Sequence, residues 1–165
     1  MKTFINSDSV RSFTFGVEDS LVSTVGLISG IAVAGVPRPT ILLTGIILIF
    51  VEALSMSAGG LLSENSAKEF EERKSLPLRR SVASAIVMFF SYFVSGLVVL
   101  LPYVLFASSL ALPVSIAVSL SALFVLGVAN ARLSSTSPLR KGMTTAVIGG
   151  LAILAGTALG AAIER

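Results

Sequence analysis

The sequence has no cysteine, no histidine and no tryptophan, and only 13% of its 165 residues are charged. Without cysteine there is no disulfide framework, no thiol nucleophile and no cysteine-based zinc site. Without histidine, the chain lacks the usual proton carrier at neutral pH and the commonest metal ligand. Metal chemistry must therefore use carboxylates, methionine sulfur, hydroxyls, amides or backbone carbonyls. No nucleophile–base pair or phosphate-binding loop occurs either, so we do not expect an enzyme.

Apolar residues take the place of the missing types. They make up 54% of the chain, and the mean hydropathy is +0.94, whereas about 25% of the residues of a soluble domain are charged. A membrane-spanning helix needs roughly 20 apolar residues, and period-2 alternation typical of strands is absent. The sequence therefore predicts an all-α, polytopic membrane protein, a single transmembrane domain over residues 1–165. Its five expected spans are 16–36, 40–62, 82–106, 111–131 and 142–163.

The polar segments between these spans predict the topology. "PRP" at 37–39 predicts a tight turn, because proline does not continue a helix, and the longest polar connection is 64–81. With five alternating spans, ten of the twelve Lys and Arg residues lie on the side that holds the N-terminus. The positive-inside rule then predicts a cytoplasmic N-terminus, a cytosolic 64–81 connection and an external C-terminus. This distribution accounts for the basic charge without a nucleic acid partner.

Three acidic residues lie within or at the edge of the expected spans. Glu52 is near the middle of the second span, and no span holds a basic residue to pair with it. A carboxylate at the bilayer centre costs about 2.5–3.5 kcal/mol on insertion scales and usually faces a cavity or a partner. Glu18 and Asp19 begin the first span, so two interpretations stay open for them: a functional role, or favourable interaction with the macrodipole in the first helical turn.

Helical spacing groups small and polar residues on two faces. Residues at i, i+4, i+7 and i+11 share a face, and small residues let helices approach closely. We therefore expect these two faces to meet each other or a second copy of the chain. The face on the first span holds Asp19, Ser23, Gly26 and Gly30; the face on the second holds Gly45, Glu52, Met56 and Gly59, with Gly60 beside it as a further packing residue.

Asp19, Met56 and Glu52 then form a ladder of ligands. At about 1.5 Å per residue, they lie roughly 5, 9 and 15 Å below the cytoplasmic boundary. Carboxylate oxygens are hard ligands and a thioether is softer, so the mixture suits a borderline ion such as iron(II), with manganese tolerated. A carboxylate in this setting also exchanges protons as the ion leaves. Additional oxygen ligands are available from Ser23, Ser55 and Glu64.

Two motifs resemble the vacuolar iron transporter family. "RSFTFGVEDSLVSTVGLISGIAVAG" at 11–35 resembles its first membrane helix, with Arg11, Gly16 and Asp19 in matching positions. "VEALSMSAGG" at 51–60 resembles its second, with Met56 matching and Glu52 in the acidic position. The likeness continues in "LLPY" at 100–103 and "RKGMTTAVIGGLA" at 140–152.

The resemblance implies a five-helix homodimer with an ion path at or near the subunit interface. It also implies removal of iron or manganese from the cytosol coupled to proton entry into the cytosol. Asp19, Glu52 and Met56 would line the path, together with Glu18, which stands where the family commonly has an amide. The chain departs from the pattern at Ser12, where the family has an acidic residue, and at Ser20, where it has a glycine.

The 64–81 connection is the larger departure. Better-known members of the family insert a long cytosolic metal-collecting domain there, so capture by this chain would depend on Glu64, Glu69, Glu71 and Glu72. The pairs Glu64–Lys68 and Glu69–Arg73 have the favourable i, i+4 order. They favour a different interpretation, a solvated helical extension that Pro77 ends.

The sequence thus predicts a dimeric secondary transporter that exports iron(II), with manganese as a second ion, by proton antiport. The alternative is a non-transporting membrane scaffold or interaction protein, in which Glu52 makes only interhelical hydrogen bonds. We expect no cofactor besides the transported ion. The partners expected are a divalent metal ion, protons, the lipid bilayer and a second copy. A short, cysteine-free chain favours a prokaryotic cytoplasmic membrane.

Overall fold

The structure, a computed structural model, describes residues 7–163, apart from the side chains of Arg80 and Ser108. Over this range the chain forms five α-helices and one short 3-10 helix, without strands. All five α-helices are long and apolar enough to cross a membrane. The predicted all-α fold with five spanning helices is confirmed. The elements are α1 (Ser7–Val33), α2 (Arg38–Glu72), η1 (Leu78–Arg80), α3 (Val82–Leu105), α4 (Ser108–Leu133) and α5 (Pro138–Ile163).

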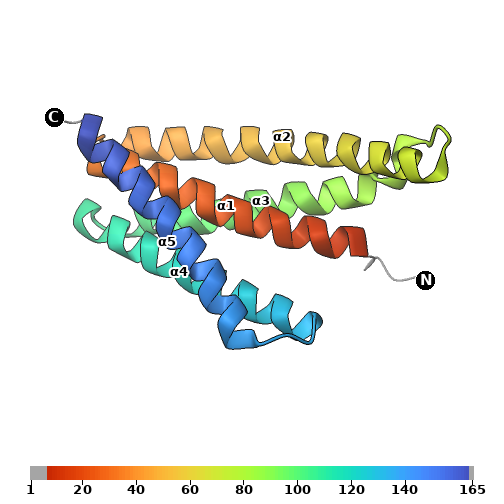
Figure 1. Ribbon diagram of the computed structural model, residues 1–165. Coiled ribbons are helices and arrows are strands. Elements are labelled where there is room, and N and C mark those ends of the chain that lie inside the picture. The colour runs from red at the N-terminus through yellow and green to blue at the C-terminus, as the bar shows by residue number, and fades with distance from the viewer. Residues whose placement is uncertain (1–6, 164–165) are drawn as a thin grey trace.

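Successive helices run in opposite directions, as Figure 1 shows. The start of α1, the α2–α3 connection and the α4–α5 connection therefore lie toward one end of the bundle (Figure 1). We call this the basic end, because it carries most of the described lysine and arginine residues. These are Arg11, Lys68, Arg73, Lys74, Arg79, Arg132, Arg140 and Lys141. Arg38 lies at the opposite end, where its Nη2 donates a hydrogen bond of 2.5 Å to the Val104 carbonyl of α3.

α1 is the central helix and packs along both α3 and α5. Its contact with α5 is made by backbone: a Cβ added to Gly156 or Gly160 would overlap the carbonyl oxygen of Gly26 or Gly30. Such close approach is how small residues join helices in membranes. We expected the face that holds Gly26 and Gly30 to meet the second span or another copy, and in the structure these two glycines meet α5 instead. Gly45 of α2 packs against Ile28 and Leu100.

The turn between α1 and α2 forms where "PRP" predicts it. The N–H groups of Gly35 and Val36 bond to the carbonyls of Ala32 and Ile31, an arrangement that ends many helices. It requires a left-handed residue at Gly35, whose φ is 68°, and glycine adopts this conformation without steric cost. Pro37 then precedes the first turn of α2.

α1 starts nine residues earlier than the apolar run predicts. The first turn of the helix therefore contains Asp8, and Glu18 and Asp19 lie about three turns further along. The interpretation of Glu18 and Asp19 as first-turn carboxylates is wrong, because the polar residues before them are also helical. Ion pairs with the end of α2, described below, stabilise this polar start.

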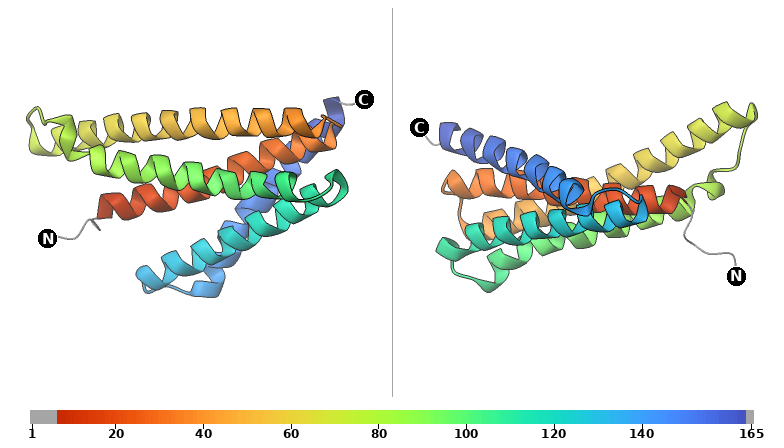
Figure 2. Two further views of the ribbon diagram at one scale, coloured as in Figure 1. Left: turned by 180° about the vertical axis from the view of Figure 1, so that it is seen from behind. Right: turned by 60° about the horizontal axis from the view of Figure 1, so that its bottom comes forward.

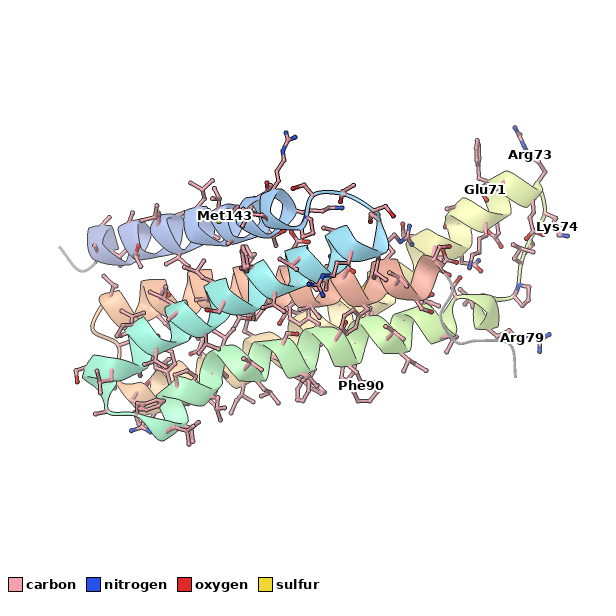
Figure 3. All side chains as sticks on the ribbon, turned by 90° about the horizontal axis from the view of Figure 1, so that it is seen from below. Glu71, Arg73, Lys74, Arg79, Phe90 and Met143 are labelled. Carbon is pink, nitrogen blue, oxygen red and sulfur yellow. The ribbon has the colours of Figure 1, made fainter. Side chains whose placement is uncertain are left out.

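α2 also extends beyond its apolar run, but it ends differently from the prediction. The helix stops at Glu72, where Arg73 adopts a left-handed conformation with φ 54°, before Pro77 is reached. The Glu69 carboxylate accepts a hydrogen bond from the Leu76 N–H at 2.8 Å. Arg73 does not pair with Glu69 as predicted; its guanidinium lies 5.2 Å from the centre of the Phe70 ring. Figure 3 shows Arg73 and Lys74 pointing away from the bundle.

Two apolar clusters fill the bundle beyond Asp19. One holds Leu21, Val25, Val99, Leu123 and Ile153. The other lies toward the opposite end and includes Ile28, Ile49, Leu100 and Tyr103. By contrast, Phe90 and Met143 point outward (Figure 3) and are more than half exposed, as side chains facing lipid would be.

Candidate functional site

Asp19 of α1 and Glu52 of α2 lie close enough for their charges to act on each other. Both side chains are half-buried. Two like charges in such a place repel unless a cation or a proton lies between them. The structure therefore brings together the two carboxylates that the sequence singled out, on neighbouring helices.

Tyr92 of α3 adds a third helix to this pair. Its side chain is fully buried, and its hydroxyl lies within electrostatic range of both carboxylates. It also shares a hydrogen bond of 2.8 Å with the Ser23 hydroxyl. The Ser20 hydroxyl donates a bond of 2.7 Å to the Tyr92 carbonyl. Asp19, Ser23, Glu52 and Tyr92 thus form one polar group, which we call the central site.

Sequence reasoning missed Tyr92. A signal for it exists, since the chain has only two tyrosines, and both fall within the apolar run of the third span. Gly16 explains how α3 comes so close to α1. A Cβ there would collide with the Ser91 hydroxyl and would lie 3.0 Å from the Met88 carbonyl. Gly16 therefore sets the spacing of α1 and α3 just before Asp19.

The remaining candidates on α2 lie on a more open surface. Met56 is half-buried one turn from Glu52, and Ser55 is exposed. A Cβ at Gly59 would meet nothing within 4 Å, whereas one at Gly60 would lie 3.0 Å from the Met88 sulfur. Gly60 thus packs on α3, while Gly59 leaves a free surface beside the carboxylate and thioether. We call the surface formed by Glu52, Ser55, Met56 and Gly59 the open face of α2.

One chain does not surround a metal ion with carboxylates. Among residues 7–163, no three His, Cys, Asp or Glu side chains are grouped so that they would hold a metal. Asp19 and Glu52 supply oxygen ligands, and Met56 lies one turn away.

Glu18 does not join the central site. It lines a cavity of about 510 Å³ between α1, α4 and α5, together with Arg11, Asn130 and Lys141. In the same cavity, the Thr14 hydroxyl donates a hydrogen bond of 3.1 Å to the Asn130 side-chain oxygen. Residues 18 and 19 are adjacent in sequence, but a helix turns by about 100° between them. Asp19 and Glu18 therefore face different surroundings.

Glu64 is buried, although we expected it on a solvated face. Its side chain is only 5% exposed, and its carboxylate lies 2.5 Å from the Lys68 ammonium and 3.9 Å from Arg11. Lys68 also contacts Asp8 of α1 at 3.0 Å. The Glu64 carboxylate is thus paired with Lys68 and Arg11, and a metal ion would have to displace these side chains.

Comparison with known proteins identifies the family. The family model described as "VIT family" matches residues 10–80 and 73–161. The chain belongs to the VIT family. With five helices long and apolar enough to cross a membrane, it is an integral membrane protein. The two matched ranges overlap at residues 73–80, which lie in the connection between α2 and α3.

Curated relatives align over nearly the whole chain. The vacuolar iron transporter 1 of Tulipa gesneriana is 29% identical, with 99% of this chain and 90% of the relative covered. The vacuolar iron transporter 1 of Oryza sativa subsp. japonica is 24% identical, with 98% and 88% covered. The tulip alignment runs over 224 positions, although this VIT-family chain has 165 residues. The relative therefore carries segments that this chain lacks.

Proposed function

We propose that this VIT-family protein carries iron(II), with manganese as a second ion, out of the cytosol in exchange for protons. The observation that carries the proposal is the Asp19–Glu52 pair, held beside Tyr92 within membrane-length helices. The names of the curated relatives support iron as the ion. The Met56 thioether, one turn from Glu52, favours a borderline metal over magnesium or calcium.

The two carboxylates provide a physical reason for exchange. Their mutual repulsion is relieved either by one divalent cation or by protons. Metal and protons therefore compete for the same oxygens, and release of one favours binding of the other. Beyond Asp19, the apolar clusters around Leu21 and Ile28 are buried, so ions would reach the central site from the basic end. The distribution of Lys and Arg supports a cytosolic location for that end.

We further propose a homodimer that places the open face of α2 at its interface. The ligand set of one chain is incomplete, and the surface at Gly59 leaves room for another helix. A second copy would bring a second Glu52 and Met56 to the same seam. For the membrane, we retain the proposal of a prokaryotic cytoplasmic membrane, while the relatives are named vacuolar.

Reconstituted vesicles test the proposed function. We expect wild-type protein to take up iron(II) when a pH gradient is imposed. Glu52→Gln should lower the initial rate of iron(II) uptake by at least about tenfold. Removing a residue that only hydrogen-bonds to a metal ligand already has an effect of that size. The matched control is Glu71→Gln, which changes the same chemical group at an exposed position of the same helix and should transport normally.

The scaffold alternative predicts different results. Wild-type vesicles would then take up no more iron(II) than empty vesicles, and Glu52→Gln would impair assembly instead. Unchanged uptake by Glu52→Gln would show that the central site is not the path. Replacing iron(II) with manganese, cobalt or zinc in the same assay measures the metal preference.

A further inference from the structure

The α4–α5 pair diverges from α1 toward the basic end, which Figure 1 and the left view of Figure 2 both show. The cavity of about 510 Å³ lies in this opening, between α1 on one side and α4 and α5 on the other. Its size is within the range of about 300–1,000 Å³ found for ligand sites. An opening between helices within a bilayer must be filled by lipid, water or protein.

The lining of this cavity combines charged, polar and apolar side chains. Arg11 and Lys141 supply positive charge, and Phe15, Leu133 and Ile148 supply apolar surface. A second cavity of about 300 Å³ adjoins it at Lys141 and Thr144 and includes Arg140. We call the two cavities together the α1–α5 groove. Cationic side chains beside apolar surface match the two parts of a phospholipid, its charged headgroup and its acyl chains.

The cations beside this cavity are less fully paired with carboxylates than Lys68 and Lys74 are. Lys68 and Lys74 contact carboxylates, but over residues 7–163 neither Arg140 nor Lys141 has an acidic partner within ion-pair distance. Arg11 has a single contact, at 3.9 Å, and its side chain is 66% exposed. The segment from Arg132 to Lys141 contains three cations and no acidic residue. The positive-inside rule accounts for positive charge on this side. The position of Arg11 and Lys141 beside a cavity is an additional feature.

We propose that the α1–α5 groove binds an anionic phospholipid of the leaflet at the basic end. The phosphate lies between Arg11, Arg140 and Lys141, and an acyl chain follows Phe15 and Ile148. Basic pockets between membrane helices on the cytoplasmic side bind such headgroups. Glu18 lies on the same wall seven residues beyond Arg11, or about 10 Å deeper. Its carboxylate repels a phosphate there and thereby keeps the headgroup near Arg11.

The absence of tryptophan from the chain allows a direct test. Phe15→Trp places a single fluorescent reporter in the groove, at a position that is 48% exposed. The full-length reporter protein is reconstituted in phosphatidylcholine vesicles that contain brominated phosphatidylglycerol or brominated phosphatidylcholine at equal mole fraction. We expect stronger quenching by brominated phosphatidylglycerol, and a loss of that preference in concentrated salt.

Two further variants of the reporter locate the preference. Arg11→Gln with Lys141→Gln should weaken it by about fivefold for each charge removed. Arg73→Gln with Lys74→Gln removes two cations from the other connection at the same end and should leave the preference intact. Equal quenching by the two lipids in the reporter, or a preference unchanged by the first pair of substitutions, overturns the proposal.

Weak quenching by both brominated lipids would also overturn it, because a second protein copy would then fill the groove. Circular dichroism and gel filtration confirm that each variant keeps its helices and its size. The proposal depends on the place of the groove in the membrane and not on transport. Failure to move iron(II) would therefore leave it standing.

Discussion

At the scale of single residues, burial separates carboxylates that look alike in the sequence. Glu71 is exposed, Glu64 is buried beside two cations, and Glu52 is half-buried beside another carboxylate. The charge of a buried carboxylate is neutralised by cationic partners. When its neighbour is another carboxylate, a bound cation lowers the repulsion between the two charges. The second arrangement is the basis of the metal binding that we propose for Glu52.

Tyr92 provides a test of the central site. Tyr92→Phe removes the hydroxyl that bonds to Ser23, and a typical buried hydrogen bond contributes about 0.5–1.5 kcal/mol. We expect a loss of stability in that range, measured by denaturant titration in detergent, together with slower iron(II) uptake.

Tyr103→Phe is the matched control for this substitution. Its hydroxyl is buried, and the described residues provide no hydrogen-bond partner for it. Removing an unsatisfied polar group should be neutral or stabilising. Equal losses in the two variants would contradict a specific role for the Tyr92 hydroxyl.

At the scale of helices, the contact between α1 and α5 depends on paired glycines. Gly26 and Gly30 face Gly156 and Gly160 so closely that backbone touches backbone. Lipid tails are as apolar as leucine, so membrane helices associate largely through such close packing. This contact fixes the position of α1, while Asp19, about two turns before Gly26, lies near Glu52 of α2 and Tyr92 of α3.

Gly156→Ala tests this contact. The new Cβ would overlap the Gly26 carbonyl oxygen, so the helices must move apart, at a cost of about 1–3 kcal/mol for an overpacked site. We expect a lower thermal midpoint in detergent. Gly150→Ala, on the same helix, adds a methyl where nothing lies within 4 Å. A midpoint lowered as much by Gly150→Ala would show that the effect comes from the helix itself and not from its packing.

At the scale of the whole molecule, the proposed dimer is open to a chemical test. The chain has no cysteine, so Gly59→Cys introduces the only thiol. If the open face of α2 lies at the interface, mild oxidation in native membranes should produce a covalent dimer on a non-reducing gel.

Gly150→Cys is the control, because that position is equally unobstructed but lies on α5. We expect it to stay monomeric under the same oxidation. Efficient cross-linking of Gly150→Cys, with none of Gly59→Cys, would show that the interface is formed by α5. It would contradict the proposed interface at the open face of α2.

Much of the fold and part of the site follow from local sequence. The apolar runs determine five helices because a backbone within lipid must satisfy its own hydrogen bonds, and Gly35 with Pro37 determines the first turn. Glu52 stands out by itself, since a lone carboxylate in an apolar run is costly. The helix ends were predicted less accurately. The polar residues 7–15 and 64–72 continue the helices, and the ion pair between Asp8 and Lys68 that joins them is not visible in local sequence.

Hydropathy and residue spacing were enough to predict the number of helices, the faces that carry glycine and the candidate carboxylates, because both are properties of neighbouring residues along the chain. Which helices meet became clear from the packing of the folded chain. This packing directed the α1 glycines to α5, turned Glu18 away from Asp19, buried Glu64, and brought Tyr92 to the central site. Each of these depends on how helices rotate and pack against one another, and residues distant along the chain set that rotation.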